Sequence, residues 1–207
     1  MGYRIETIDP ARAVVIVVDM QNDFVRQGAP LEVPDARATI AANRRLADGF
    51  RSRGLPVIYT RFISLESDNH LWRWSPQCWP EIRCCWAGHM RRYGDSAGEL
   101  DCSAIIDELG PAPGDIILDK HGYGAFSGTD LDRRLRNAGV RSLLVTGTVT
   151  QICVEETARE TFHHGYNTVI ASDAVSSFAA DLHSATLKNF AMKFGWVTDS
   201  ETALSWL

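Results

Sequence analysis

The chain alternates between short runs of apolar, β-branched residues and longer segments with helical periodicity. The clearest run, Ala13–Val18, is continuously apolar and is followed by the carboxylate Asp19. This pattern is typical of a strand buried on both faces of a parallel sheet. Residues 36–53 then have helical periodicity up to Gly54, where a helix is expected to stop. Residues 56–62 predict a second strand.

The second half of the chain repeats this alternation of strands and helices. Because strands joined by helical crossovers form parallel sheets, we expect an α/β fold with three layers. The fold class is a doubly wound, mostly parallel sheet of Rossmann-like order with helices on both faces. Further strands are predicted at 115–120, 143–145 and 167–174, and helices at 131–137, 154–162 and 182–194. Residues 195–201 predict a short edge strand that runs into a final turn of helix.

Residues 63–114 interrupt the pattern with weak periodicity and an unusual composition. We interpret them as an insertion of loops and short helices near the carboxyl edge of the sheet, within a single domain that spans 1–207. Long loops in compact domains are often lids or pocket walls. The insertion holds most of the tryptophans and cysteines of the chain: Trp72, Trp74, Trp79, Trp86, Cys78, Cys84, Cys85 and Cys102.

Charge and composition narrow the class of partner. The net charge is -5 and charges of both signs are interspersed, so neither a nucleic acid nor a membrane surface is expected as a partner, and a small molecule is. Ala13–Val18 is too short to span a bilayer, and the residues before it lack the features of a signal peptide. Cysteines at irregular spacing, odd in number, favour reduced thiols. We therefore expect a cytoplasmic protein.

Residues 141–162 hold the most informative cysteine. An apolar run predicts a strand, small and β-branched residues predict a turn, and the helical pattern begins directly after Cys153. At a helix entrance, free amides and the helix dipole stabilise negative charge, so a thiol there can ionise near neutral pH. Cys153 is therefore a candidate nucleophile. A buried cysteine that acts as a small apolar side chain is the alternative.

Two further polar residues fall at equivalent places in the predicted fold. Asp19 follows the first strand, Lys120 ends the third, and Cys153 follows the fourth. Ligands of doubly wound folds bind at these carboxyl ends. A lysine cation lowers the pKa of a thiol, and a partly desolvated carboxylate can carry protons between thiol, leaving group and water. Taken singly, Asp19 could cap a turn and Lys120 could be a surface lysine.

Three ordered motifs resemble the isochorismatase-like cysteine hydrolases. They read VVIVVDMQNDF at 14–24, KHGYGAFSGTDL at 120–131 and VTGTVTQICVEETARE at 145–160. The resemblance implies that Asp19, Lys120 and Cys153 form a catalytic triad. It also implies a cis peptide between Thr148 and Val149, and an oxyanion hole formed by the amides of Val149 and Cys153.

This resemblance implies a cysteine hydrolase that cleaves a C–N bond of a small amide, ureido or carbamoyl compound through a thioester. Family substrates include nicotinamide, ureido acids, biuret-like compounds, maleamate and carbamoylated amines. The closing run 194–201 looks like that of ureidoacrylate hydrolases. Alternatives are vinyl ether hydrolysis, as in isochorismatases, and a non-catalytic binding subunit. The resemblance further implies a homo-oligomer, either a dimer or a tetramer.

Two positions depart from the family pattern without touching the triad. Gly124 stands where a serine is frequent and Gln151 where an aspartate is frequent. For the substrate pocket we predict four aromatic side chains from the triad motifs and the insertion. They are Phe24, Tyr123, Trp72 and Trp74.

No metal or other cofactor is expected. Nicotinamidases of the family bind a divalent ion through an Asp-x-His element after the second strand. Asp68 and His70 have this spacing, but they come later than that element. A second set, Cys78, Cys84, Cys85 and His89, lacks the paired spacing of structural zinc sites, so unpaired structural cysteines are the preferred interpretation.

Overall fold

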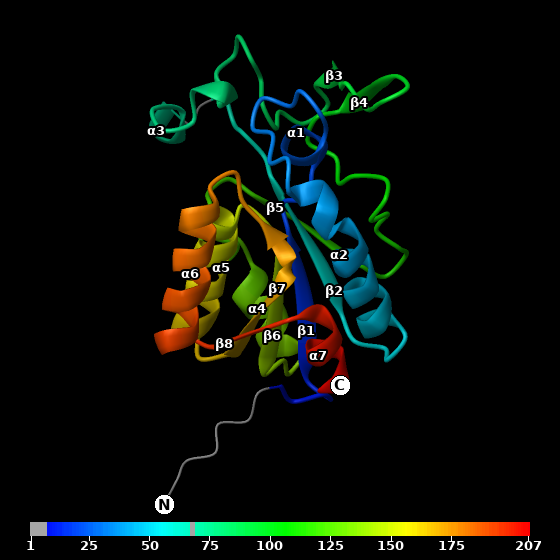
Figure 1. Ribbon diagram of the computed structural model, residues 1–207, viewed down its shortest axis with the longest axis vertical. Coiled ribbons are helices and arrows are strands. Elements are labelled where there is room, and N and C mark those ends of the chain that lie inside the picture. Colours follow the sequence, from blue (N-terminus) through cyan, green and yellow to red (C-terminus); the bar gives the residue numbers. More distant parts are fainter. Residues whose placement is uncertain (1–7, 67–68) are drawn as a thin grey trace, which may run out of the picture.

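The core of the protein is a six-stranded sheet in which every pair of neighbouring strands is parallel (Figure 1). The computed structural model describes residues 8–66 and 69–207. The spatial order is β5-β2-β1-β6-β7-β8, so the Rossmann-like order predicted from the sequence is confirmed. The strands are β1 Ala13–Val18, β2 Val57–Phe62, β5 Ile116–Lys120, β6 Ser142–Thr148, β7 Asn167–Ser176 and β8 Trp196–Thr198.

Helices cover both faces of this sheet and produce the three predicted layers (Figure 1). Side chains of β1 alternate between the two faces: Val15 and Val17 pack into one core, and Val14 and Ile16 into the other. Both faces are therefore apolar, which explains the continuous apolar run in the sequence. Helices α2 Ala36–Arg51 and α7 Ser200–Ser205 cover the first face, and α4 Leu131–Asn137, α5 Glu155–His163 and α6 Ala180–Lys193 cover the second.

None of the helices in the described parts of the chain has the length and hydrophobicity that crossing a bilayer requires. The helix predicted at 36–53 ends two residues early, at Arg51, and Gly54 follows with a φ of 69°. This left-handed conformation is one that glycine adopts without strain.

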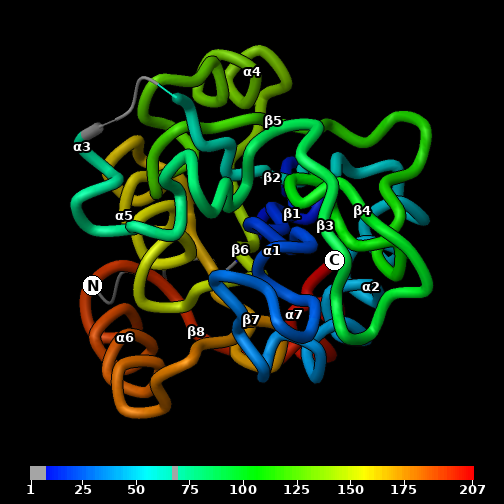
Figure 2. Tube along the Cα trace, turned by 90° about the horizontal axis from the view of Figure 1, so that it is seen from above, coloured from blue at the N-terminus to red at the C-terminus, as the bar shows by residue number. Residues whose placement is uncertain are grey.

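The region 63–114 lies over the carboxyl ends of the strands, as Figure 1 and the view from above in Figure 2 show. The sequence predicted loops and short helices here but missed the antiparallel hairpin of β3 and β4. Buried Gln21 holds the region in place, because its side chain bonds Phe62 of β2 and the Ser103 carbonyl. The short elements are α1 Asn22–Val25, α3 Asn69–Trp72, the 3-10 helix Pro76–Cys78, β3 Met90–Arg92 and β4 Glu99–Asp101.

Candidate active site

Three polar side chains meet at the carboxyl ends of three strands of the sheet. Asp19 follows β1, Lys120 ends β5, and Cys153 lies in the turn after β6. Lys120 Nζ lies 2.8 Å from Asp19 Oδ2, and neither side chain is exposed. The Cys153 thiol lies near enough to both groups for each of them to shift its pKa. The parallel sheet brings them together, because β2 pairs with both β1 and β5 while β6 flanks β1 on its other side.

The turn that carries Cys153 is a π-helical segment, Thr150–Val154. The α-helix begins only at Glu155, one residue later than the sequence predicted, and the wider turn before it was not predicted. The amides of Ile152 and Val154 both donate to the Val149 carbonyl, at 3.0 and 3.2 Å. Single π turns of this kind are frequent at functional sites.

The strand end before this turn has an unusual backbone. The peptide bond between Thr148 and Val149 is cis, at the position that the family resemblance implies. Gly147 precedes it with a φ of 100°, and a Cβ at this position would collide with the backbone of Val18. Only glycine permits this close approach of β6 to β1.

Lys120 is held in place by three oxygen atoms. Its ammonium donates to the carbonyls of Gly122 at 2.9 Å and Tyr123 at 2.8 Å, and it pairs with Asp19. Burial by itself lowers the pKa of Lys120, but the charges of Asp19 and Cys153 outweigh burial and raise this pKa above its ordinary value. Lys120 therefore stays cationic although it is buried.

Asp19 is oriented by Thr60, a residue of β2 that the sequence reasoning missed. The Thr60 hydroxyl donates to Asp19 Oδ1 at 2.6 Å, and the Asp19 amide donates to Thr60 Oγ1 at 3.2 Å. Asp19 Oδ2 forms an ion pair with Lys120, but the geometry of this contact is not that of a hydrogen bond. This oxygen is thus available to accept a proton. A possible signal for Thr60 was its place near the end of the strand adjacent to β1.

The protonation state of Cys153 differs from the sequence prediction. Burial raises the pKa of the Cys153 thiol to about 12, and Lys120 lowers it by less than burial raises it. The prediction of a thiol ionised near neutral pH is therefore wrong for the unliganded protein. The sequence prediction took account of the helix entrance and the lysine. It did not include the burial of the thiol or the ion pair in which Asp19 neutralises Lys120.

Cys153 opens into a cavity of about 380 Å³. Its wall is mostly apolar. It comes from the segment after β1, the end of β2, the insertion, and the segments after β5, β6 and β7. This size and composition suit a small molecule with an apolar part. The apolar wall residues include Phe24, Leu31, Phe62, Trp74, Ile152 and Phe178, and Val149 lies beside Cys153.

Of the four aromatic residues predicted for the pocket, the structure places three around this cavity. Phe24, Trp74 and Tyr123 line it. Trp72 does not, because its indole stacks on Trp86 and donates to the hydroxyl of Ser64 at 3.3 Å. Trp72 thus packs inside the insertion, and its prediction as a pocket residue is corrected. The wall also holds Ser75 and Gln77, which the sequence reasoning did not single out.

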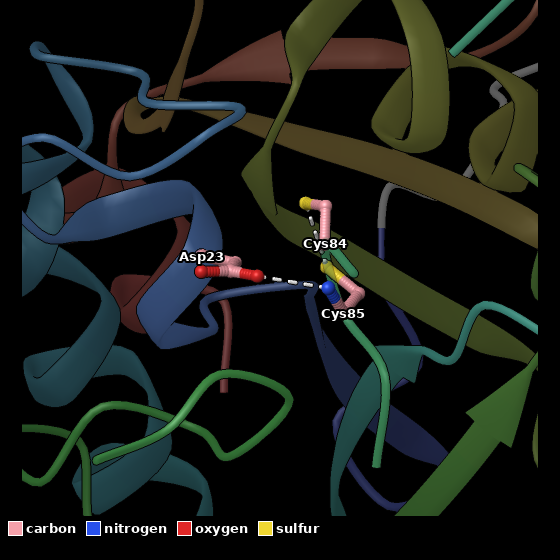
Figure 3. A group of neighbouring side chains, drawn as sticks. All are labelled: Asp23, Cys84 and Cys85. Atoms are coloured by element: carbon pink, nitrogen blue, oxygen red, sulfur yellow. Dashed lines mark hydrogen bonds between the residues drawn. The ribbon is translucent and has the colours of Figure 1, made fainter. Parts of the chain in front are cut away.

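A separate group of sulfur and oxygen atoms lies where α1 meets the insertion (Figure 3). Ligand atoms of Asp23, Cys84 and Cys85 lie within 4.8 Å of one another. The Asp23 carboxylate, however, already accepts hydrogen bonds from the Cys85 amide at 2.8 Å, Arg91 at 2.9 Å and Tyr93 at 2.7 Å. These contacts tie α1 to the insertion, so the geometry favours a structural role for Asp23.

The cysteines of the insertion are free and buried. Cys84 Sγ and Cys85 Sγ are 3.6 Å apart, and burial raises the pKa of both thiols. His89 is not among the residues whose ligand atoms gather there. Of the alternative metal pair, Asp68 lies outside the described residues, and the side chain of His70 is exposed.

The fold and the site define a class: an α/β enzyme with a cysteine, a lysine and an aspartate at the carboxyl edge of a parallel sheet. The family model described as the isochorismatase domain matches residues 13–202. The chain therefore belongs to the isochorismatase family and is an isochorismatase-like hydrolase.

Named relatives cover nearly the whole chain. The ureidoacrylate amidohydrolase RutB of Agrobacterium fabrum is 33% identical over 204 residues, which cover 92% of this chain and 88% of the relative. A cysteine hydrolase from Pseudomonas syringae pv. phaseolicola has a TM-score of 0.86 at 28% identity, with 100% and 98% of the two chains covered. The N-carbamoylsarcosine amidase of Thermoplasma acidophilum has a TM-score of 0.72 at 30% identity, with 92% and 97% covered.

Proposed function

We propose that this protein is a cysteine-dependent hydrolase that cleaves a C–N bond of a small amide, ureido or carbamoyl compound through a thioester. The observation that carries the proposal is the buried ion pair of Asp19 and Lys120 beside a cysteine that opens into an apolar cavity. Similarity to a ureidoacrylate amidohydrolase and an N-carbamoylsarcosine amidase supports the choice of a C–N bond.

Acylation starts from a protonated thiol. Cys153 Sγ attacks the carbonyl carbon of the substrate while its proton passes to Asp19, whose Oδ2 has no hydrogen-bond partner among the described residues. The negative charge that develops on the carbonyl oxygen is stabilised by the amides of Val149 and Cys153. Asp19 then donates the proton to the departing nitrogen. The C–N bond breaks, an amine or ammonia leaves, and Cys153 carries a thioester.

Deacylation uses the same carboxylate as a base. Asp19 accepts a proton from a water molecule, whose oxygen attacks the thioester carbonyl. Collapse of the second tetrahedral intermediate breaks the C–S bond, releases a carboxylic or carbamic acid, and returns the proton from Asp19 to Cys153. One water is consumed for each C–N bond cleaved.

Lys120 supplies a fixed positive charge throughout the cycle. Its contacts with Gly122 and Tyr123 prevent it from moving away when Asp19 becomes neutral. At that moment the Lys120 charge is no longer offset by Asp19, so it stabilises the thiolate and the oxyanion. The ion pair thus makes charge available at the step that needs it.

The test is ammonia release from a panel of small amides and ureido compounds by the wild-type protein and by Cys153→Ala. We expect release by the wild type and its loss in the variant, together with an acyl adduct on Cys153 in intact-mass spectra of quenched reactions. Full activity of Cys153→Ala would disprove the proposal. Assays with chelator present test the prediction that no metal is required.

Vinyl ether hydrolysis and a non-catalytic role are separated by the same samples. Release of pyruvate from isochorismate, without ammonia release from any amide, would identify the isochorismatase reaction. The thiol beside Asp19 and Lys120 argues for the amide reaction, because thioester chemistry needs a nucleophile and vinyl ether protonation does not.

The remaining expectations concern organisation. We propose one hydrolase domain over 1–207 that acts in the cytoplasm as a homo-oligomer. Several large apolar side chains at the surface support self-association, among them Trp79, Phe178 and Met192. Light scattering coupled to size exclusion measures the molar mass, and the mass of a single 23.0 kDa chain would contradict this expectation.

A further inference from the structure

The charges around the cavity carry information about the substrate beyond the reaction type. Among the described residues that line the cavity, none is a lysine, an arginine or a histidine. The single carboxylate of the wall, apart from the triad, is Glu32. A hydrogen bond from the Gly28 amide and the ion pair with Arg37 hold the pKa of Glu32 below its ordinary value, so it is negative at neutral pH.

The cationic side chains close to the wall either pair with other groups of the protein or are not part of the lining. Arg37 donates to Glu32 at 2.8 Å and to the Val25 carbonyl at 2.7 Å. Lys120 is surrounded by Asp19 and two backbone carbonyls and is completely buried. Arg73 precedes the wall residue Trp74, but its side chain is exposed and not part of the lining.

Apart from Glu32 and Cys153, the polar side chains that line the cavity are uncharged. Tyr123 and Ser75 both line it, and their hydroxyls lie 3.3 Å apart. Gln77 also lines it. Such groups bind carbonyl, amide or hydroxyl groups of a ligand.

A substrate carboxylate placed in this cavity would lose water without gaining a counter-charge from any described residue of the wall. Moving an unpaired charge out of water is strongly unfavourable, whereas an apolar group gains from the same transfer. On the basis of the proposed function, we infer that the substrate is an uncharged amide or ureide whose non-reacting part is apolar, with no carboxylate. Ureidoacrylate, the substrate in the name of the relative from Agrobacterium fabrum, is an acid and is disfavoured here.

The test uses pairs of compounds with the same reacting group and similar size. Valeramide is compared with succinamate, and butylurea with N-carbamoyl-β-alanine, by ammonia release from the full-length protein. We expect the uncharged member of each pair to have a kcat/KM at least about tenfold higher, a factor that corresponds to about 1.4 kcal/mol. Preference for the carboxylates would overturn the inference and leave the proposed function intact. Lack of turnover for every compound would overturn both.

Variants of Gln77 test whether the wall itself sets the preference. Gln77→Lys introduces a cation of similar size, and Gln77→Met is the uncharged control. We expect Gln77→Lys to raise the ratio of kcat/KM for succinamate over valeramide by about tenfold, and Gln77→Met to leave this ratio near the wild-type value. An unchanged ratio in a folded Gln77→Lys protein would overturn the inference. If that variant does not fold, the comparison of the paired compounds with the wild-type protein still tests the inference.

Discussion

Lys120 Nζ and Asp19 Oδ2 lie 2.8 Å apart, with both side chains completely buried. The two residues are far apart in the sequence and belong to strands that are not neighbours in the sheet, because β2 lies between β1 and β5. A buried ion pair contributes little net stability, since desolvation offsets the attraction. We therefore attribute the pair to the proposed reaction rather than to stability.

Lys120→Met leaves the Asp19 carboxylate buried without a counter-charge. We expect a loss of about 3–5 kcal/mol in the free energy of unfolding and loss of activity. The double variant Asp19→Asn/Lys120→Met removes both charges, so it should regain most of the stability and none of the activity. Urea denaturation of the single and double variants measures this, and additive losses would show that the charges do not interact.

Thr60→Val removes the hydroxyl that donates to Asp19 Oδ1 at 2.6 Å. Because this hydroxyl orients the carboxylate, we expect kcat to fall by about tenfold or more with little change in KM. Thr60→Ser keeps the hydroxyl and should retain most of the activity. Equal activity in Thr60→Val and Thr60→Ser would mean that the contact does not position Asp19.

Alkylation of Cys153 should depend steeply on pH. Burial raises the pKa of this thiol to about 12, so the thiolate is scarce at neutral pH. We expect iodoacetamide to label Cys153 before the other cysteines, because it lines the cavity while they are sealed in the core. The labelling rate should keep rising through about pH 10 without a plateau. A plateau near pH 7, measured by peptide mass spectrometry, would indicate a thiolate that is already formed.

The stability of the protein at alkaline pH should depend on the burial of its thiols. Burial raises the pKa of Cys85, as of Cys153, to about 12, above the value of about 8.5 for an unfolded thiol. A raised pKa favours the folded state in full below the unfolded pKa, and this contribution is lost as pH rises toward the folded pKa. Each such thiol should lower the free energy of unfolding by up to about 1.4 kcal/mol per pH unit above about pH 8.5.

The Cys85→Ala variant is the control for this alkaline loss. It should show a smaller slope of unfolding free energy against pH than the wild type, although its stability at neutral pH is lower because a buried side chain is truncated. Denaturation curves between about pH 8 and pH 11 measure the two slopes. Equal slopes would assign the alkaline loss to other groups.

Sequence reasoning predicted the architecture because its physical signals are local. Continuous apolar runs such as Ala13–Val18 indicate strands covered on both sides, and helical periodicity between them implies parallel crossovers. The sheet order followed from these signals and from the resemblance to the family. The positions of Asp19, Lys120 and Cys153 at strand ends were also readable, since the carboxyl ends of parallel strands share one edge.

Only the tertiary structure decided which contacts the insertion makes and whether the Cys153 thiol is protonated. The hairpin β3–β4, the packing of Trp72 on Trp86 and the hydrogen bond of Thr60 to Asp19 depend on residues distant in sequence. The pKa of Cys153 depends on burial and on whether Lys120 already has a partner, and neither appears in a local pattern. The sequence by itself thus determined which groups reach the site. Only the folded chain decided their charges and produced a cavity wall whose described residues include no cationic side chain.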